Sequence, residues 1–220
     1  MEKMIVKFAL FFGLLFSVFS ASAAVQERPD FGPGGLFGLT REQREELDRG
    51  EIVLPKSAVE TSGGKTLIEA AMIFSVPPDE AFRLLARGED QAKYLAEVKS
   101  VVVISRTPDR EHLEFTTKVM TKTIVYRQIT RFEPAHLFIQ WSLDDTFKSD
   151  LKELDGFWRF YPYAEGKTLA RYGSRVLPRI PVPGFIRSAL AKNRLRSALE
   201  DVKSYVESGG TGENGRNSMP

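Results

Sequence analysis

The pattern of apolar and polar positions from residue 51 onward predicts a chain dominated by strands. The predicted strands are runs rich in β-branched and aromatic residues, separated by Gly, Pro or Asp turns. They occupy residues 51–59, 65–76, 98–106, 111–121, 123–133, 136–143, 153–163 and 167–178. The last six runs follow one another with turns or one loop between them and no helical pattern, so we expect a long antiparallel sheet that buries one face.

Helical patterns flank the first strands. Thr40 and Gln43 have the spacing of a capping box, and Gly50 fits the end of a short helix that follows Thr40. The segment 77–80, Pro-Pro-Asp-Glu, suits the first turn of a second helix, because Pro is tolerated there and acidic side chains favour the positive end of the helix dipole. Residues 90–98 predict a third, shorter helix.

The longest helical pattern begins near Gly184. One apolar stripe with helical spacing should pack on the sheet and contains Ala191, Leu195, Ala198, Leu199, Val202 and Val206. A second apolar group, centred on nearly the opposite side, contains Phe185, Ile186, Ala189 and Leu190. The elements together predict an α+β architecture: a curved antiparallel sheet wrapped around a long C-terminal helix, with two short helices after the first main strand. Such a sheet leaves a cavity under the helix unless large side chains fill it.

The first residues have the pattern of a secretory signal peptide: a charged start, an apolar run at 8–19 and small residues before the predicted cleavage after Ala23 or Ala24. An uncleaved membrane anchor is the alternative, but the run is short for a bilayer span. We expect an exported protein, periplasmic or secreted. Its expected parts are a signal peptide at 1–24, a flexible leader at 25–39, one globular domain at 40–207 and a disordered tail at 208–220.

Composition narrows the chemistry. The chain has no cysteine, which excludes disulfides, thiolate metal sites and a cysteine nucleophile. His112 and His136 lie at predicted strand starts beside turns, so we interpret both as turn-edge histidines. The acid-rich segment 143–155 lacks the spacing of a calcium loop and is predicted to be a solvated loop. The sequence implies no metal and no cofactor, and export argues against a nucleic-acid partner.

Two blocks of the sequence resemble a known family. Residues 64–106, GKTLIEAAMIFSVPPDEAFRLLARGEDQAKYLAEVKSVVVISR, resemble the opening of the START-like superfamily, the polyketide cyclase/dehydrase and lipid-transport group with the SRPBCC fold. Residues 155–186, DGFWRFYPYAEGKTLARYGSRVLPRIPVPGFI, resemble its closing block. The resemblance covers roughly residues 40–206 and is that of an exported bacterial member. It implies the helix-grip fold, which serves lipid carriers, cyclases, quinone-binding chaperones and hormone receptors alike.

A heavy aromatic load on the predicted sheet suggests a ligand cavity. Trp158 and Phe160 share parity and are placed inward, with Arg159 and Tyr161 on the other face. Any single ring could simply pack the core, but for the set as a whole the implied fold favours a cavity wall. The residues predicted for that wall are Phe115, Trp141, Trp158, Phe160, Tyr172 and Leu195.

The stretch 166–199 contains eight cations and no acid, although the net charge of the chain is only +2. One interpretation is that this stretch forms the mouth of the cavity and contacts an anionic membrane surface. The residues predicted for the mouth are Ile180, Val182, Phe185, Ile186, Arg179 and Arg187. The alternative is that the apolar residues pack under the loop after the first helices and that the cations form a solvated face.

The predicted function is binding, with carriage as an extension, of a hydrophobic small molecule or lipid in an apolar cavity in the cell envelope. One alternative is a cyclase/dehydrase-type enzyme, which needs a polar group with a shifted pKa inside the cavity. Glu114, Tyr126 and Tyr172 are the candidates for that group, and none is assigned as catalytic. The other alternative is an envelope interaction module with a filled core. We expect a monomer.

Overall fold

The computed structural model describes residues 28–55, 59–60, 66–119, 121–179 and 184–212, and only the backbone at 59–60, 66 and 184–193. The helices are α1 (Arg41–Asp48), α2 (Pro78–Leu85), α3 (Gln91–Tyr94) and α4 (Gly184–Glu207), with 3-10 turns η1 (Gly88–Asp90) and η2 (Pro134–His136). The strands are β1 (Val59–Glu60), β2 (Thr66–Phe74), β3 (Val98–Arg106), β4 (Arg110–Val119), β5 (Lys122–Glu133), β6 (Phe138–Leu143), β7 (Leu151–Pro162) and β8 (Thr168–Pro178).

Strands β2 to β8 form one curved antiparallel sheet, and the two-residue β1 extends its edge beside β2. The order is β1-β2-β8-β7-β6-β5-β4-β3, so the first main strand pairs with the last one. The predicted α+β class and antiparallel sheet are confirmed, and so are the two short helices after β2. The strand predicted at 51–59 is largely wrong: among residues 51–55, which the structure describes, only Val53 forms a bridge, to Ala71. Pro55, which has no backbone N–H to donate, interrupts the run there.

Local signals explain the first helix. The Gln43 backbone N–H donates to Thr40 Oγ1 at 3.3 Å, and the Thr40 N–H donates to Gln43 Oε1 at 2.9 Å. This is the predicted capping box, which satisfies two of the N–H groups left unpaired at a helix start. Gly50 then turns the chain with a φ of 80°, in the region that glycine adopts without strain.

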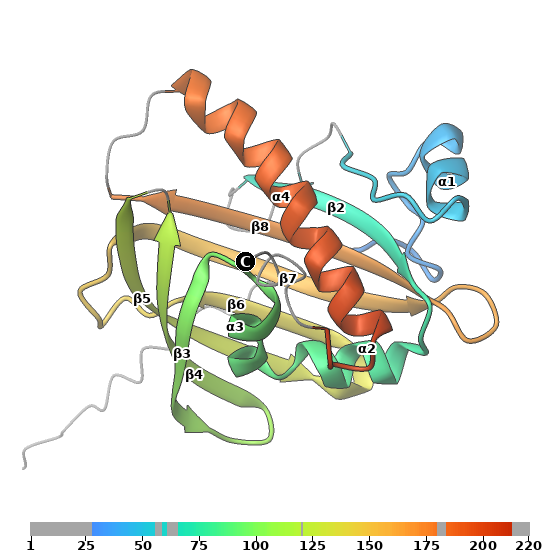
Figure 1. The fold of residues 1–220 in the computed structure, drawn as a ribbon. Helices are drawn as coiled ribbons and strands as arrows, with labels where there is room; N and C mark the ends of the chain where they lie inside the picture. Colours follow the sequence, from blue (N-terminus) through green and yellow to red (C-terminus); the bar gives the residue numbers. More distant parts are fainter. Residues whose placement is uncertain (1–27, 56–58, 61–65, 120, 180–183, 213–220) are drawn as a thin grey trace, which may run out of the picture.

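The inner face of the sheet packs against α2, α3 and α4 (Figure 1). On α4, whose side chains are described from Arg194, the residues that reach the core include Leu199, Val202, Tyr205 and Val206. Trp158 and Phe160 point into this inner core, whereas Tyr161 joins the core of the other face, so the predicted parity is confirmed. None of the described helices is long and apolar enough to cross a membrane.

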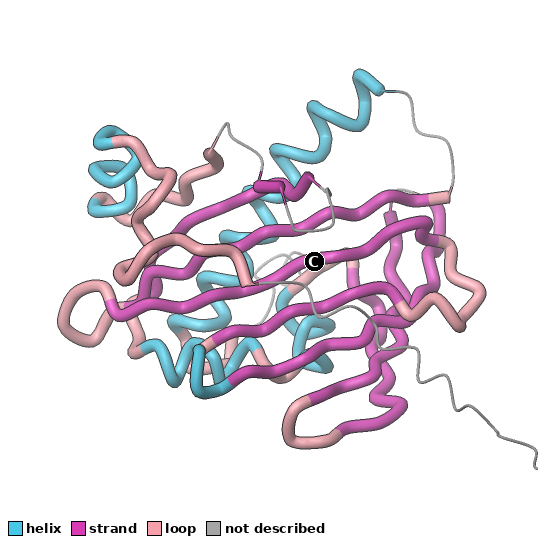
Figure 2. The backbone as a smooth tube through the Cα atoms, turned by 180° about the vertical axis from the view of Figure 1, so that it is seen from behind, coloured by secondary structure: helices cyan, strands magenta, loops and turns pink. Residues whose placement is uncertain are grey.

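Part of the outer face of the sheet, on β2, β6, β7 and β8, is also buried, against the one-sided expectation. Residues 28–39, which form most of the predicted flexible leader 25–39, cross this face instead as a packed strap (Figure 2). Phe31 and Leu39 of the strap are buried against the sheet together with Leu47 of α1. The leader prediction is therefore wrong from residue 28 onward, because its Gly and Pro residues shape turns between buried apolar anchors.

The C-terminal tail is folded at its start. The Gly210 backbone N–H donates to the Tyr205 carbonyl at 2.9 Å, and Thr211 Oγ1 donates to the Ser208 carbonyl at 2.8 Å. Residues 208–212 thus close the end of α4, and the predicted disorder is wrong for them. Residues 213–220 and the predicted signal peptide at 1–24 lie outside the described residues.

Candidate functional site: a cavity between the sheet and the last helix

A cavity of about 180 Å³ lies between the inner face of the sheet and the helices α2, α3 and α4. Its sheet wall comes from β4 to β8, and its other walls come from the α2–α3 connection and from one side of α4. The apolar and aromatic residues of the wall include Leu85, Tyr94, Leu95, Tyr126, Phe132, Ile139, Trp141, Leu154, Trp158, Tyr172, Leu195, Leu199 and Val202.

Three rings make the centre of the sheet wall. The ring centroids of Trp158 and Tyr172 are 4.6 Å apart, and those of Trp141 and Tyr172 are 5.9 Å apart. Burial raises the pKa of Tyr172, so its phenol stays protonated at neutral pH and can donate a hydrogen bond. The chain contains two tryptophans, and both line this cavity.

The structure brings four of the six predicted wall residues together: Trp141, Trp158, Tyr172 and Leu195 all line the cavity. Phe115 and Phe160 lie behind the wall. Phe115 stacks on Tyr126 with centroids 5.1 Å apart, so the Tyr126 ring lies on the cavity side. Phe160 packs between Trp158 and Phe82. Contact of any of these residues with a ligand stays a prediction.

One end of the cavity carries buried polar side chains that the aromatic pattern did not reveal. Glu111, Gln128 and Thr130 all point inward from β4 and β5, and each is at least nine-tenths buried. Gln128 Nε2 donates to Thr130 Oγ1 at 3.0 Å. Strand parity could have placed these residues inward, because Glu111 shares the parity of Leu113 and Phe115 in β4, and Gln128 and Thr130 share that of Tyr126 in β5.

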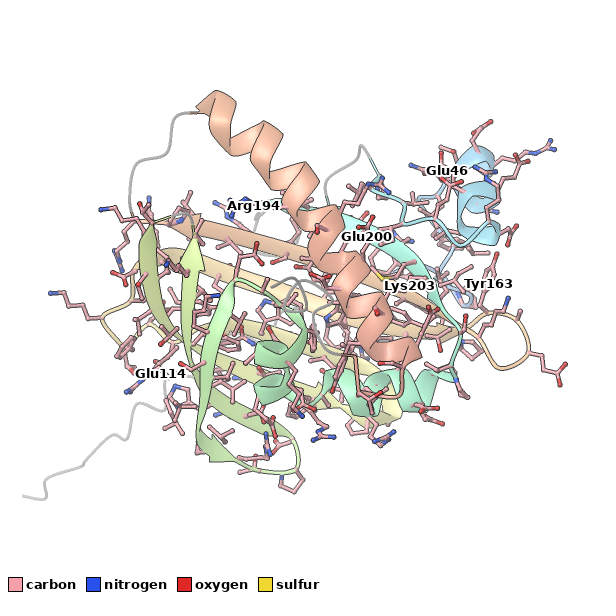
Figure 3. All side chains as sticks on the ribbon, in the orientation of Figure 1. Glu46, Glu114, Tyr163, Arg194, Glu200 and Lys203 are labelled. Carbon is pink, nitrogen blue, oxygen red and sulfur yellow. The ribbon has the colours of Figure 1, made fainter. Side chains whose placement is uncertain are left out.

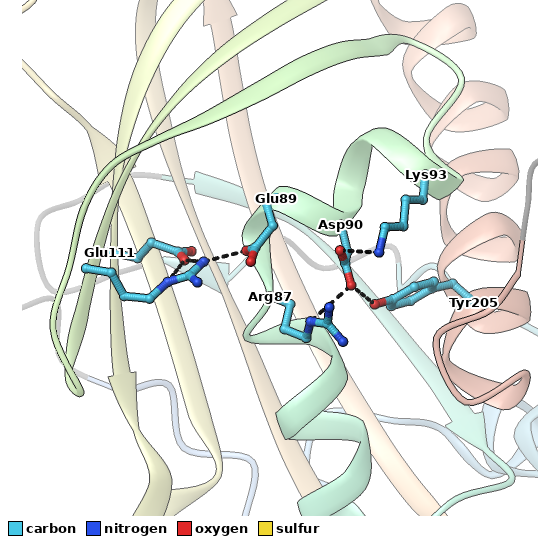
Figure 4. A network of polar contacts seen from close by, with 7 residues as sticks. Arg87, Glu89, Asp90, Lys93, Glu111 and Tyr205 are labelled. Carbon is cyan, nitrogen blue, oxygen red and sulfur yellow. Dashed lines mark hydrogen bonds and ion pairs between the residues drawn. The ribbon is translucent and has the colours of Figure 1, made fainter.

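The Glu111 carboxylate is held from outside the cavity by Arg106. Arg106 Nε donates to Glu111 Oε1 at 2.6 Å, and Arg106 Nη2 also reaches Glu89 Oε2 at 2.5 Å (Figure 4). Burial raises the pKa of Glu111, although Arg106 opposes the shift. Glu111 Oε2 has no hydrogen-bond partner within the described part of the chain and lies against Gly88.

The connection between α2 and α3 is tied to α4 by a second polar cluster (Figure 4). Tyr205 OH donates to Asp90 Oδ2 at 2.7 Å, and Lys93 Nζ lies 2.6 Å from Asp90 Oδ1. Arg87 Nε lies 3.1 Å from Asp90 Oδ2, and the rings of Tyr94 and Tyr205 stack with centroids 4.3 Å apart. These contacts hold the helical end of the cavity against the last helix.

The candidates for chemistry are divided between the two faces. Tyr126 and Tyr172 line the cavity, but Glu114 lies on the other side of the sheet, away from α4, where Arg127 Nε donates to it at 2.9 Å (Figure 3). His112 lies near the start of β4, as predicted, and its Nε2 lies 2.8 Å from Asp144 Oδ2.

The acid-rich segment contains a buried acid, whereas the second histidine lies at the surface. Asp144 is 2% exposed and accepts hydrogen bonds from Thr146, so the solvated-loop interpretation is wrong for this residue. His136 is exposed in η2. Among the described residues, no group of three or more His, Asp and Glu side chains is placed to hold a metal ion.

The structure describes few side chains of the residues predicted for the mouth of the cavity. Ile180 and Val182 lie outside the described residues, and Phe185, Ile186 and Arg187 are described only as backbone in α4. Arg179 is exposed, and its Nε donates to the Ser149 carbonyl at 2.9 Å. Membrane contact by this segment stays a prediction.

The basic stretch is not one continuous cationic surface. Arg171 is buried on the outer face with its Nη2 3.4 Å from Glu69 Oε2. Arg175 pairs with Glu153 at 2.6 Å. The excess of positive charge in this stretch of sequence is therefore smaller in the folded protein, because neighbouring strands bring in acidic side chains that are distant along the chain.

The fold and the cavity define the helix-grip class, in which a curved sheet packs around a helix. A family model described as polyketide cyclase/dehydrase and lipid transport matches residues 74–203, more than half of the chain. The chain therefore belongs to the polyketide cyclase/dehydrase and lipid transport family. The predicted START-like resemblance is confirmed. No curated protein matches the chain.

Solved structures share the fold at low sequence identity. A STAR-related lipid transfer protein from Xanthomonas axonopodis has a TM-score of 0.57 and 10% identity, covering 70% of this chain and 98% of that chain. The Zhui aromatase/cyclase from a Streptomyces species has a TM-score of 0.56 and 14% identity, covering 64% and 93%. A START superfamily protein from Mycobacterium smegmatis has a TM-score of 0.54 and 17% identity, covering 64% and 97%. At these identities the likeness concerns the fold alone.

Proposed function

We propose that this protein binds a hydrophobic small molecule in the cavity beneath α4 and that it does so in the cell envelope as a monomer. One observation carries the proposal: aromatic and aliphatic side chains surround a cavity of about 180 Å³ that they do not fill. A ligand there gains roughly 25 cal/mol for each Å² of apolar surface removed from water. The interaction-module alternative needs a filled core, and the cavity counts against it.

The size of the cavity limits the ligand. An apolar cavity of roughly 150 Å³ holds a molecule such as benzene, whereas pockets for drug-sized ligands measure roughly 300–1,000 Å³. The cavity therefore suits a small ring compound or one end of a longer lipid. A whole phospholipid would require α4 or the α2–α3 connection to move outward. That the sheet wraps the full length of α4 is part of this proposal, since α4 side chains are described only from Arg194.

Tryptophan fluorescence offers a direct test, because Trp141 and Trp158 are the only tryptophans of the chain and both line the cavity. Titration with small alkylbenzenes should change the emission and saturate. The variant Trp158→Phe should retain a weaker response from Trp141. An emission that no hydrophobic probe changes, together with native mass spectra free of any bound molecule, would rule out the binding function.

Carriage and location are extensions of the same proposal. The signal pattern at 1–24 supports export, and the family supports lipid transport as one role. N-terminal sequencing of the protein recovered from its own cells should begin at residue 24 or 25. A mature protein that still starts at Met1 would contradict export.

Cyclase/dehydrase chemistry is a second candidate, favoured by one observation. Glu111 is a buried carboxyl on the cavity wall with a raised pKa, which is a property of acid–base groups in enzymes. A poly-β-carbonyl probe incubated with the protein should then yield a dehydrated cyclic product. Glu111→Gln should abolish that product while the protein still binds alkylbenzenes.

A further inference from the structure

A row of inward-facing residues crosses five strands at the polar end of the cavity. The register pairs Glu111 with Thr130, Thr130 with Trp141, Trp141 with Gly156, and Gly156 with Ser174. Gly156 leaves room for the Trp141 ring, because a Cβ there would lie 2.3 Å from it. The row thus places hydrogen-bonding side chains on either side of an aromatic platform, and four of its members line the cavity.

The polar residues at the β4–β5 end have hydrogen-bonding capacity to spare. Gln128 Nε2 donates to Thr130 Oγ1, which leaves the amide oxygen and the second N–H of Gln128 and the O–H of Thr130 for other partners. Both side chains are more than nine-tenths buried, and both line the cavity. An apolar guest would shut these groups off from water without offering them a partner, which is unfavourable, so a guest with its own hydrogen-bonding group is favoured there.

We propose that Gln128 and Thr130 recognise the hydroxyl group of a small amphipathic ligand whose apolar body packs against Trp141, Trp158 and Tyr172. This inference rests on the proposed binding function and names the class of ligand: a small alcohol or phenol with an apolar body. The ligand hydroxyl donates to the Gln128 amide oxygen and accepts from the Thr130 hydroxyl.

Glu111 gives this end of the cavity a negative charge. It stands opposite Thr130 on the neighbouring strand, and its carboxylate is buried. Arg106 binds it from the outside of the wall and is itself shared with Glu89, so the cluster contains two acids and one cation. A ligand carboxylate would meet this negative charge in a low-dielectric environment, which disfavours fatty acids and other anions relative to neutral alcohols.

Three probes with the same apolar body test the inference: para-propylphenol, para-propyltoluene and para-propylbenzoate. Dissociation constants are measured by heteronuclear NMR titration of the folded protein. We expect the phenol to bind about tenfold more tightly than the toluene, because only the phenol forms hydrogen bonds to Gln128 and Thr130; tenfold corresponds to about 1.4 kcal/mol. The benzoate should bind the most weakly of the three.

Variants separate recognition from packing. Gln128→Leu combined with Thr130→Val should reduce the preference for the phenol over the toluene to about twofold or less, with binding of the toluene retained. The matched control is Gln140→Leu, because Gln140 is equally buried on the neighbouring strand but does not line the cavity. The control should keep the tenfold preference.

The outcomes distinguish this inference from the proposed function. Equal affinity of the wild-type protein for the phenol and the toluene would overturn hydroxyl recognition and leave hydrophobic binding intact. Preferred binding of the benzoate would overturn the role given to Glu111. If none of the three probes bound, the proposed function itself would fail. Because the wild-type comparison needs no variant, a misfolded variant would not prevent a decision.

Discussion

The two faces of the sheet bury polar side chains in opposite ways. On the outer face, Arg171 is 1% exposed, and its Nη1 donates to the carbonyls of Gly35 and Phe37 at 2.8 and 3.0 Å. Its guanidinium also lies 3.8 Å from the centroid of the Phe31 ring. On the inner face, Gln128 and Thr130 bond mainly to each other beside an open cavity. The outer polar group is thus enclosed by the chain's own strap, whereas the inner ones leave room for another molecule.

The difference shows how to separate structural from functional polar groups in this fold. Burial lowers the pKa of Arg171 and raises that of Glu69, and the attraction between the two opposes both shifts. Their ion pair therefore keeps two charges buried only as long as the strap residues complete it. The Gln128 amide and the Thr130 hydroxyl are neutral, so leaving them without a ligand destabilises the folded protein much less than leaving a buried charge unpaired.

Breaking the Arg171–Glu69 ion pair on the outer face should have the largest effect on stability. Arg171→Met leaves Glu69 buried without its partner and removes the anchor of the strap. The free energy of unfolding should fall by about 3–5 kcal/mol, measured by urea denaturation. The double variant Arg171→Met with Glu69→Leu should recover much of the loss. If Arg171→Met alone were nearly neutral, the strap would not depend on this ion pair.

A change under the inner wall should affect both stability and binding. In Gly156→Ala, the added Cβ would meet the Trp141 ring at 2.3 Å and the Gly173 carbonyl at 2.7 Å, so the ring must shift toward the cavity. We expect a destabilisation of about 1–3 kcal/mol and weaker binding of alkylbenzenes. Gly166→Ala is the control for a glycine change on the surface, although its φ of 68° adds local strain. Unchanged binding in Gly156→Ala would show that Trp141 is not part of the binding wall.

Loosening the helical end should have a moderate, pH-dependent effect. Burial alone would raise the pKa of Asp90, but hydrogen bonds from Lys93 and Tyr205 and the charge of Arg87 lower it below 3.8. The resulting stabilisation is present above pH 3.8 and is lost as the pH falls through the lower folded-state pKa. Tyr205→Phe should cost about 1–2 kcal/mol at neutral pH.

The same variant should also lose less stability on acidification than the wild type, because part of the shift in Asp90 is gone. Urea denaturation at neutral pH and below pH 3.8 measures both effects. Identical acid sensitivity in the two proteins would mean that Tyr205 does not stabilise the ionised Asp90.

The smallest effect on folding is expected at the predicted mouth. Replacing Phe185 and Ile186 with Ser should leave stability within roughly 0.5 kcal/mol of the wild type if both are exposed. Transfer of a fluorescent lipid from anionic vesicles should slow, and added salt should weaken vesicle association. A large loss of stability would instead place these residues in the core, as the alternative interpretation holds.

Much of the fold was predictable because its signals are local. The capping box at Thr40, the proline start of α2 and the alternation that sends Trp158 inward depend on neighbours within a few residues. The aromatic residues of the strands and the apolar stripe of the last helix together led to four residues that line the cavity. It could not show that Phe115 lies behind Tyr126, because that depends on how two strands pair and how their rings stack.

The sequence by itself determined the main strands β2 to β8, the helix starts, the inward parity of Trp158 and Phe160 and the family resemblance. Only the tertiary structure decided that residues 28–39 cover the outer face and that the Arg171 charge is paired with Glu69. It alone decided that Gln128 and Thr130 border the cavity that the last helix leaves open. The physical reason is that local conformation depends on adjacent residues, whereas enclosure depends on partners about a hundred positions away, which no short-range pattern encodes.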